Sequence, residues 1–349
     1  MAPVILRLKR SAGARVSVLA TGQHRELLDT ALELFGITPD SDLGVMTQNQ
    51  TLPQLTSRLI VALDAFLESA EPEIVLVQGD TTSAMVAGLA CFYRGIPVGH
   101  VEAGLRTHNM RNPFPEELNR VMLSRLATWH FCPTERNRRE LAREGVQENV
   151  YVTGNTVIDA LRIVAAKSDA VDLPIDTSKR LILATIHRRE SIGDPMRQIA
   201  AALRMLATKY TDIQIVIPVH PNPSVANVIR GELADVANVI LCEPLGYGAL
   251  VALLKRCFFV ISDSGGIQEE APALSKPVLV VRGETERLEA IEAGVAKLVG
   301  TETSSIVSAA EDLLDNEAAY CAMARGVSPY GDGMAAERIA EILGFGHAL

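Results

Sequence analysis

Short runs of β-branched and other apolar residues alternate along the chain with longer segments in which apolar residues recur at helical spacing. The short runs predict β-strands at residues 16–19, 74–77, 98–101, 129–132, 150–152, 181–186, 213–219, 239–241, 259–262 and 278–281. Strands that are separated by helix-length segments form βαβ units with right-handed crossovers, so the strands are expected to be parallel. The predicted fold class is therefore α/β.

The predicted strands fall into two sets, separated by residues 156–179. This segment carries a helical pattern over 157–167 and then a polar stretch that contains a proline, which is typical of a link between domains. The pattern predicts a Rossmann-like domain over residues 1–156, a second over 157–333, and a helix in 334–349 that would pack back on the first. The two parallel sheets would face a cleft, the usual position of ligands in open α/β folds.

Composition narrows the function classes. The chain has 349 residues, of which 48% are hydrophobic and 21% charged, with a formal net charge of −9. Because an acidic surface repels phosphate polymers and anionic lipid, neither nucleic acid nor a membrane is an expected partner. No apolar run is long enough to span a bilayer and no secretory leader is recognised, so we expect a cytoplasmic protein.

The cysteines and histidines give no pattern of a metal site. The five cysteines are scattered without a CxxC pair, and the seven histidines do not form an HExxH motif. Scattered cysteines in apolar surroundings are typical of reduced core thiols. The sequence therefore predicts a protein without a metal or a disulfide framework.

The tetrapeptide DSGG at 263–266 follows a predicted strand and precedes a helix that we expect to begin near Ile267. Paired glycines at a helix start let a ligand approach the free backbone N–H groups and the positive end of the helix dipole, which suits a diphosphate. Glu270 lies about one turn further along, where a carboxylate could reach a ribose diol. The alternative is an ordinary helix capped by Ser264 or Asp263. NAD is disfavoured because no GxGxxG motif is present.

Three carboxylates of the first half follow predicted strands or lie in a nearby loop. Asp80 and Glu102 come just after strands, and Glu116 lies with Glu117 in the turn-rich stretch that follows. Carboxylates that converge on one sheet edge suit general acid–base chemistry. Asp80 could instead cap a helix, and Glu116 could be a first-turn acid after Pro115.

Charged residues also follow strands of the second half. The segment HRRE at 187–190 comes directly after a predicted buried strand, and His220 lies between two prolines at the end of the next one. Histidine titrates near neutral pH and arginine binds phosphate, so these residues could line a ligand site. A loop salt bridge and a structural histidine are the alternatives.

Ten segments, in order, resemble the non-hydrolysing bacterial UDP-N-acetylglucosamine 2-epimerases over nearly the whole chain. They are VQGDTTSA, GHVEAGLRT, FPEELNR, FCPTERNRREL, VTGNTVIDAL, HRRESIGDP, PVHPNP, SDSGGIQEEAP, KPVLVVRGETERLEAI and SPYGDG. The resemblance implies a fold like that of the GT-B glycosyltransferases, with UDP in the cleft between two Rossmann-like domains. It also implies conversion of UDP-N-acetylglucosamine to UDP-N-acetylmannosamine for cell-surface polysaccharide synthesis, without a cofactor, by a homodimer.

The resemblance also implies site residues, for a reaction in which UDP is eliminated and then added back after C2 receives a proton on its other face. The implied catalytic residues are Asp80, Glu102, Glu116 and His187. The implied binding residues are Ser264, Gly265, Gly266, Glu270 and Leu250, with Arg188 and His220 as further candidates. Within that set, the serine and glycines match the diphosphate loop, the glutamate matches the ribose ligand, and Leu250 lies in a stretch that flanks uracil.

The chain departs from the family pattern at its start. Family members begin with a buried strand and a Gly-Thr-Arg-Pro-Glu loop, whereas residues 1–4 match a later helix. We therefore expect that strand and that loop to be missing from this chain. The alternative functions are a hydrolysing 2-epimerase, a GT-B glycosyltransferase that uses the same donor, and an inactive nucleotide-sugar binding protein.

Overall fold

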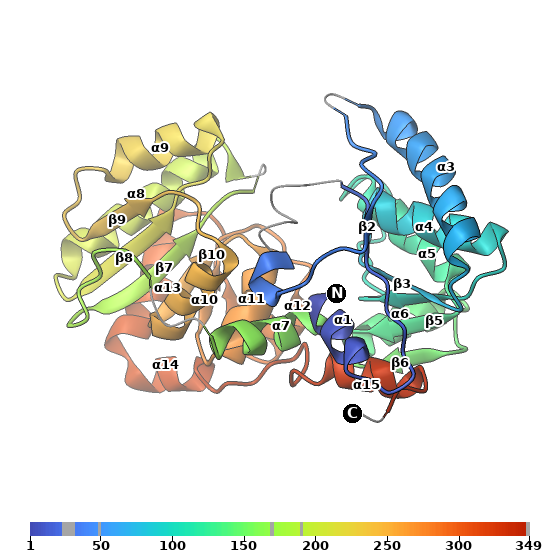
Figure 1. Ribbon diagram of the computed structural model, residues 1–349. Coiled ribbons are helices and arrows are strands. Elements are labelled where there is room, and N and C mark those ends of the chain that lie inside the picture. Colours follow the sequence, from blue (N-terminus) through green and yellow to red (C-terminus); the bar gives the residue numbers. More distant parts are fainter. Residues whose placement is uncertain (23–31, 48–49, 168–170, 189–190, 347–349) are drawn as a thin grey trace. The chain divides into compact units, whose positions relative to one another are not determined.

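The computed structural model describes residues 1–22, 32–47, 50–167, 171–188 and 191–346. The chain divides into two compact units, the first formed by Met1–Ala160 together with Tyr330–Leu349 and the second by Leu161–Pro329 (Figure 1). Every pair of strands in the described residues is parallel. The α/β class with parallel sheets is thereby confirmed.

The second unit is built on a six-stranded sheet in the order β12-β11-β10-β7-β8-β9. Its strands are β7 (Arg180–Thr185), β8 (Ile213–Pro218), β9 (Val239–Cys242), β10 (Phe259–Ser262), β11 (Val278–Val280) and β12 (Ala296–Leu298). The order runs outward on both sides from the central pair β7 and β10, as in a Rossmann sheet. Ligands bind at the carboxyl ends of such a pair, where the chain direction of the connections reverses.

The core of this unit follows from the sequence pattern. Strand β8 is buried at every residue from Ile213 to Ile217, as expected of a strand that is covered on both faces. The helix α8 (Asp194–Lys209) contributes a buried stripe at helical spacing that includes Met196, Ile199 and Leu203. The remaining helices are α9 (Pro223–Leu233), α10 (Tyr247–Arg256), α11 (Gly265–Ala273), α12 (Leu288–Glu292), α13 (Thr303–Asp315) and α14 (Glu317–Met323).

The first unit contains a four-stranded sheet in the order β3-β4-β5-β6 and a separate two-stranded sheet of β1 and β2. Its strands are β1 (Leu19–Ala20), β2 (Ser41–Asp42), β3 (Val75–Gln78), β4 (Val98–Val101), β5 (Trp129–Cys132) and β6 (Val150–Val152). Its helices are α1 (Ala2–Lys9), α3 (Leu52–Ala70), α4 (Thr82–Tyr93), α5 (Glu116–Leu126), α6 (Glu135–Arg143), α7 (Thr156–Ala165, shared with the second unit) and α15 (Ala335–Ile342).

Helix α5 is seated on α4 through a glycine. A Cβ atom on Gly88 would lie 2.8 Å from Cδ2 of Leu123, so a larger residue there would force this leucine to shift. A similar constraint holds in the sheet, where a Cβ atom on Gly99 of β4 would lie 2.5 Å from Cδ2 of Leu76. Glycine at these two positions lets the neighbouring leucine side chains approach the backbone closely.

The helix α15 brings the end of the chain back to the first unit. The carboxylate of Asp159 in α7 accepts hydrogen bonds from the backbone N–H groups of Ala335 (3.2 Å) and Ala336 (2.8 Å). Arg7 of α1 binds the carboxylate of Glu337, and α1 and α15 lie side by side (Figure 1). The domain boundaries at 156 and 333 stay predictions.

The structure differs from the predicted elements at three places. Among the described residues, the first strand is Leu19–Ala20 instead of 16–19, the strands β2 and β12 were not predicted, and α11 begins at Gly265, two residues before Ile267. The residues of β12 are Ala, Lys and Leu, of which the last two are exposed, so this edge strand lacks the apolar signal of the others.

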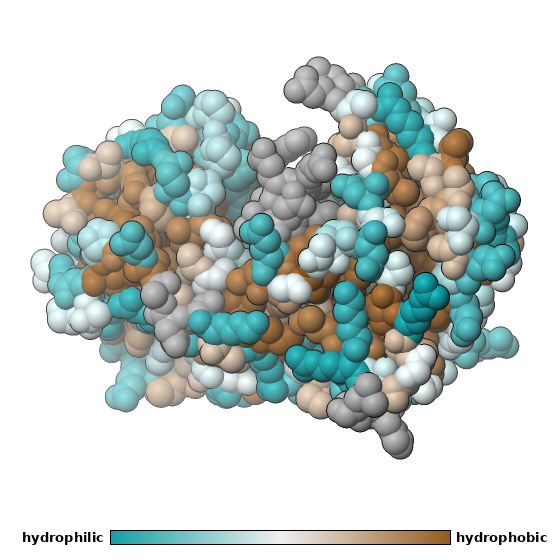
Figure 2. Space-filling model, viewed as in Figure 1, coloured by the Kyte–Doolittle hydropathy of each residue, from teal (hydrophilic) through white to brown (hydrophobic). Residues whose placement is uncertain are grey.

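None of the described helices is long and apolar enough to cross a bilayer. On the face shown in Figure 2, hydrophilic residues are interspersed with apolar ones over both units.

Candidate active site

A pocket of about 280 Å³ lies in the second unit, where β7, β8 and β10 end. This is the position that the strand order predicts for a ligand. Six of the predicted site residues line it: His187, His220, Leu250, Ser264, Gly266 and Glu270. Arg188 and Gly265 are not among its lining residues but lie beside it, since a Cβ atom on Gly265 would be 3.5 Å from Nη2 of Arg188.

The start of α11 offers free backbone donors to this pocket. Ser264 occupies the N-cap position, but its side chain makes no capping hydrogen bond, and the carboxylate of Asp263 binds the loop after β7 instead. The alternative of an ordinary capped helix is therefore wrong. A helix start without a side-chain cap leaves N–H groups of the first turn for an anion, and the helix dipole favours the same charge.

Glu270 lies in the first turns of α11 and is paired with a tyrosine. The hydroxyl of Tyr247 donates to Oε1 of Glu270 over 2.5 Å, and the glutamate is only 5% exposed. Burial raises the pKa of Glu270 to about 7, although the tyrosine hydrogen bond acts in the opposite direction. A carboxylate with one oxygen bound by a tyrosine keeps its second oxygen as an acceptor, which suits a hydroxyl group of a ligand.

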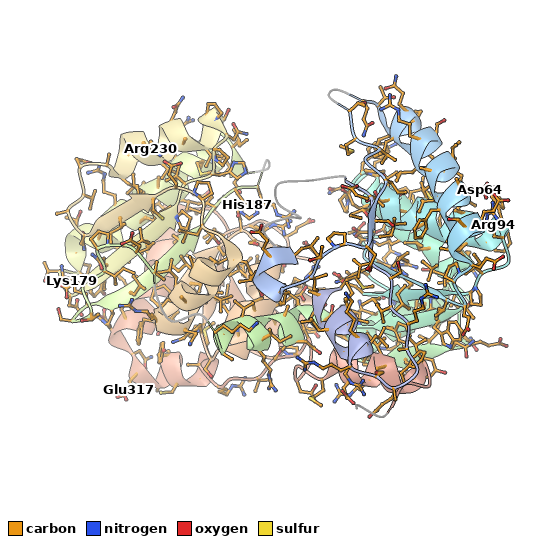
Figure 3. All side chains as sticks on the ribbon, viewed as in Figure 1. Asp64, Arg94, Lys179, His187, Arg230 and Glu317 are labelled. Carbon is orange, nitrogen blue, oxygen red and sulfur yellow. The ribbon has the colours of Figure 1, made fainter. Side chains whose placement is uncertain are left out.

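His187 is held by a buried aspartate at the end of β10. The fully buried carboxylate of Asp263 accepts hydrogen bonds from the N–H groups of His187 (3.0 Å) and Arg188 (2.9 Å) and from the Ser191 hydroxyl (3.1 Å). Its Oδ1 also lies 3.3 Å from Nδ1 of His187. Figure 3 shows His187 in the loop after β7. A carboxylate at Nδ1 leaves Nε2 as the ring atom that can exchange a proton with a ligand.

His220 is stacked on His187, with ring centroids 6.2 Å apart and planes at 19°. Its Nδ1 accepts a hydrogen bond from the N–H of Asn222 (3.1 Å), so Nε2 carries the ring proton and is the remaining donor. His220 thus has a structural bond and also lines the pocket. Arg189 and Glu190 of the same predicted cluster lie outside the described residues.

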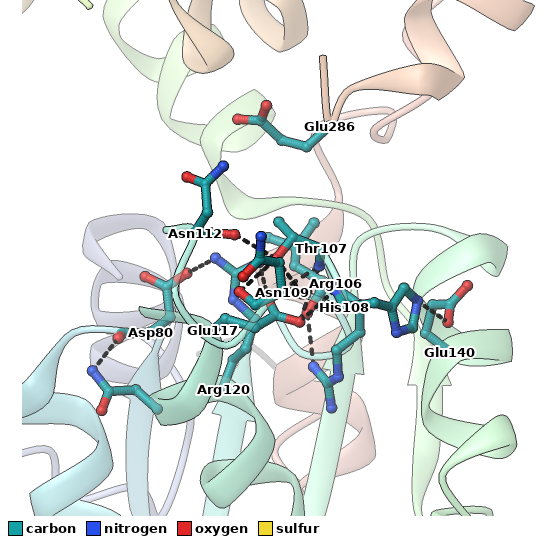
Figure 4. Close-up of polar contacts among 12 residues, drawn as sticks. Asp80, Arg106, Thr107, His108, Asn109, Asn112, Glu117, Arg120, Glu140 and Glu286 are labelled. Atoms are coloured by element: carbon teal, nitrogen blue, oxygen red, sulfur yellow. Dashed lines mark hydrogen bonds and ion pairs between the residues drawn. The ribbon is translucent and has the colours of Figure 1, made fainter. Parts of the chain in front are cut away.

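In the first unit, Asp80 lies in the loop after β3 and pairs with α5. Its Oδ2 is 2.5 Å from Nη2 of Arg120, and its carbonyl oxygen accepts from the Asn119 side chain (2.8 Å) (Figure 4). The N-cap of α4 is Thr81, whose hydroxyl accepts from the N–H of Ala84. The alternative that Asp80 caps this helix is therefore wrong.

Glu102 follows the neighbouring strand β4, so it shares the sheet edge of Asp80. Its Oε2 accepts a hydrogen bond from the Gln78 side chain over 3.3 Å and would lie 3.9 Å from a Cβ atom on Gly79. The backbone of Glu102 is left-handed, with φ of 66°. A non-glycine residue in this region is strained, and such strain is common at functional sites.

Glu116 and Glu117 begin α5 and differ in their surroundings. Glu117 is 1% exposed, and its carboxylate accepts from the N–H groups of Thr107 (3.0 Å) and His108 (2.9 Å) and lies 3.3 Å from Nη1 of Arg120 (Figure 4). Oε2 of Glu116 is buried without a hydrogen-bond partner in the part of the chain that the structure describes. Glu116 is indeed a first-turn acid, as the alternative has it, but it does not share the role of its neighbour in fixing the loop.

Several residues that build these sites were not predicted from the sequence. Asp263 contacts His187, and Arg120 contacts Asp80. Tyr247 contacts Glu270. In each pair the two residues lie in different parts of the sequence. The sequence signal for Asp263 is its position directly after a predicted strand, where it was considered only as a helix cap. In the described ranges, no group of three or more His, Cys, Asp or Glu side chains is arranged to hold a metal ion.

Comparisons with known proteins find similarity over nearly the whole chain. The family model for UDP-N-acetylglucosamine 2-epimerase matches residues 6–344. The UDP-N-acetylglucosamine 2-epimerase of Escherichia coli (strain K12) is 48% identical over 354 residues, covering 98% of this chain and 94% of that protein. A crystal structure of the UDP-GlcNAc 2-epimerase from Neisseria meningitidis bound to UDP-GlcNAc is 45% identical, with a TM-score of 0.90, covering 98% and 95% of the two chains.

The fold extends to more distant proteins. The glycosyltransferase SnogD from Streptomyces nogalater has a TM-score of 0.63 at 18% identity, covering 99% of this chain and 95% of that one. This likeness concerns the fold alone and agrees with the GT-B-like class. Full-length identity and the family model go further, and they show that the chain belongs to the UDP-N-acetylglucosamine 2-epimerase family, of the non-hydrolysing bacterial type.

Proposed function

We propose that this enzyme interconverts UDP-N-acetylglucosamine and UDP-N-acetylmannosamine by eliminating UDP and adding it back. The observation that carries the proposal is the full-length similarity to the Neisseria meningitidis enzyme bound to UDP-GlcNAc. The pocket of the second unit supports it, because a helix start with paired glycines and a tyrosine-bound glutamate suit a diphosphate and a ribose.

The proposed reaction has two half-reactions. In the first, a base removes the proton at C2 while the bond between C1 and the diphosphate oxygen breaks, which gives UDP and a 2-acetamidoglucal. In the second, a proton is delivered to the opposite face of C2 and the diphosphate oxygen bonds to C1 again. The products have the same atoms as the substrate with C2 inverted.

The residues divide between these tasks. We assign the C2 proton transfers to Asp80, Glu102 and Glu116, because positioned carboxylates are suited to general acid–base catalysis. His187 lies in the pocket with the α11 start, so it would stabilise the charge on the departing diphosphate as an imidazolium held by Asp263. Stabilising the negative charge on the departing UDP lowers the activation barrier of the elimination step.

The remaining binding residues are assigned by their place in the pocket. Ser264, Gly265 and Gly266 would bind the diphosphate, Glu270 the ribose, and Leu250 the uracil ring. Arg188 and His220 would add a cation and an N–H donor beside the diphosphate.

The test is proton NMR of the reaction with UDP-N-acetylglucosamine in deuterated water. We expect UDP-N-acetylmannosamine to appear and the C2 proton signal of both sugars to disappear as deuterium enters. Epimerisation that leaves the C2 proton in place would overturn the elimination route. Stoichiometric release of free UDP would instead identify a hydrolysing or glycosyl-transferring enzyme.

The proposal also includes the oligomeric state of the enzyme and its location in the cell. We propose a homodimer that acts in the cytoplasm, with UDP and UDP-N-acetylglucosamine as its small-molecule partners. Light scattering coupled to size-exclusion chromatography would test the dimer, and a mass equal to a single chain at micromolar concentration would contradict it.

A further inference from the structure

Three arginines surround one carboxylate beside the start of α11. Oε2 of Glu286 lies 2.9 Å from Nη1 of Arg282, and its Oε1 lies 3.7 Å from Nη2 of Arg188 and 3.8 Å from Nη1 of Arg287. The Glu286 side chain is 28% exposed, so it is neither a core residue nor a freely hydrated one. Burial alone would raise the pKa of Glu286, but the three arginines and a backbone hydrogen bond together keep it below its usual value.

The same carboxylate lies against the first residue of the helix. A Cβ atom on Gly265 would be 3.4 Å from Oε1 of Glu286 and 3.8 Å from Cζ of Arg287. Gly265 is the first residue of α11, and its neighbours Ser264 and Gly266 line the pocket. Glu286 therefore places a negative charge where a helix N-terminus and arginines would favour an anionic ligand.

We propose that Glu286 is a built-in competitor of the diphosphate, and that it sets how tightly the enzyme holds UDP. This inference rests on the proposed function, because it assigns the α11 start to the diphosphate. A carboxylate and a phosphate present similar oxygen pairs to a guanidinium, so Arg188 and Arg282 bind either of them in the same way. A diphosphate that enters must therefore take these donors from Glu286 and tolerate its charge, and Glu286 can take them back when UDP leaves.

A competitor and a structural support predict opposite effects of one substitution. If Glu286 competes, Glu286→Gln removes the charge at nearly the same size, and UDP binds about tenfold more tightly, the effect of about one charge-assisted hydrogen bond. If Glu286 only holds the arginines in place, the same change disorders them and UDP binds more weakly. The direction of the change in the dissociation constant thus decides between the two roles.

The chain offers a matched control in the same loop. Glu284 is exposed, and Glu284→Gln removes the same charge two residues away. Any general effect of net charge on an anionic ligand is shared by both variants. Uridine is the second control, because it lacks the diphosphate and its affinity should be the same in all three proteins.

The experiment is calorimetric titration of the wild-type enzyme, Glu286→Gln and Glu284→Gln with UDP and with uridine. We expect tighter UDP binding in Glu286→Gln alone, with a slower dissociation rate by stopped flow and unchanged uridine binding. Glu286→Asp, which keeps the charge on a shorter side chain, should also bind UDP more tightly, by a smaller factor, and serves if the glutamine variant does not fold.

Each other outcome overturns the inference. Unchanged or weaker UDP binding in the Glu286 variants excludes a competitor, and so does an equal gain in Glu284→Gln or with uridine. In these cases wild-type binding of UDP leaves the proposed function standing. Wild-type enzyme that does not bind UDP would overturn the proposed function itself and the inference with it.

Discussion

Two neighbouring glutamates at the start of α5 have different roles in this protein. Glu116 and Glu117 are consecutive first-turn acids of α5, yet only Glu117 fixes the loop through the N–H groups of Thr107 and His108. The helix turns by about 100° per residue, so the two side chains point in different directions and meet different surroundings. The first-turn position explains why both are acidic, but not which one is free for chemistry.

This difference gives the first prediction. Glu116→Gln should lower kcat by about 10²-fold, the usual effect of losing a positioned acid or base, and leave the melting temperature unchanged. Glu117→Gln should instead lower the stability by about 1–3 kcal/mol, because its buried partners lose a charged acceptor. Steady-state kinetics and thermal melting of both variants check this, and equal effects of the two changes on both quantities would contradict the assignment.

Asp263 has no direct place in the pocket, so its effect on catalysis should pass through His187. We expect His187→Gln and Asp263→Asn each to lower kcat by about 10²-fold, while the double variant is scarcely worse than the worse single variant. A double-mutant cycle on kcat measures this coupling. Fully multiplicative losses would mean that the two residues act independently, as would be expected if Asp263 only stabilised the fold.

At the scale of elements, the start of α11 presents backbone N–H groups to the pocket of the second unit. A Cβ atom on Gly266 would meet only Oε2 of Glu270, at 3.9 Å, so the fold itself accepts a side chain there. What a side chain would disturb is the approach of a ligand to the helix start. The glycine therefore serves binding more than folding.

We predict that Gly266→Val weakens UDP binding by about tenfold or more while melting stays cooperative. Gly231→Val in α9 is the control, because a Cβ atom there has no neighbour within 4 Å. Calorimetry with UDP compares the two variants with the wild-type enzyme. The same dissociation constant in a folded Gly266→Val protein would place the diphosphate elsewhere.

The sheet of the first unit carries two buried histidines side by side. His100 of β4 and His130 of β5 are register partners, and burial lowers the pKa of each to about 4. The unfolded chain takes up these protons near pH 6.5, whereas the folded sheet resists them until about pH 4. Their contribution to stability is therefore complete above pH 6.5 and is lost as the pH falls toward 4.

We expect the free energy of unfolding to fall by about 2 kcal/mol per histidine between pH 8 and pH 5. His130→Gln should remove about half of this dependence. Trp129, the single tryptophan of the chain, lies next to His130 and reports urea unfolding of the first unit by fluorescence. Burial raises the pKa of Glu270 in the second unit, so this residue makes the stability rise as the pH falls, opposite to the histidines. The test therefore compares the pH dependence of His130→Gln with that of the wild-type protein. An identical pH dependence of the two proteins would refute the assignment to His130.

At the scale of the whole molecule, the chain leaves the first unit at α7 and returns to it at α15. The link is polar and specific, since Asp159 receives the first N–H groups of α15 and Arg338 donates to the carbonyl of Thr153 over 3.0 Å. The apolar side adds Ile339 and Ala340, which pack in one cluster with Val4 of α1. The end of the sequence is thus part of the core of its beginning.

Asp159→Ala should lower the stability of the first unit by about 1–2 kcal/mol, the usual effect of losing a side-chain cap. Urea unfolding followed at Trp129 measures it. Asp332→Ala is the comparison, because Asp332 pairs with Arg338 at the surface and exposed pairs contribute little. A larger loss in the surface variant than in Asp159→Ala would contradict the capping role.

Most of the strands and the motifs could be predicted from the sequence, because they depend on residues that are close together in the chain. The strands at 98–101, 129–132, 150–152 and 259–262 have the bounds that were predicted, because apolar runs and their flanking turns are local properties. The motifs also indicated the family, and comparison confirmed it. The placement of carboxylates and histidines after strands followed from the same alternation.

Which of these residues contact one another is decided by the tertiary structure and not by the local sequence. Asp263 reaches His187 and Asp80 reaches Arg120 across 76 and 40 residues of sequence, and the competing position of Glu286 exists only because its loop folds against α11. Such pairings are set by packing between elements, for which a single sequence carries no local signal. The first-turn position likewise does not distinguish Glu116 from Glu117; the resemblance implied Glu116 alone, and the buried donors around Glu117 show the structural role of its neighbour.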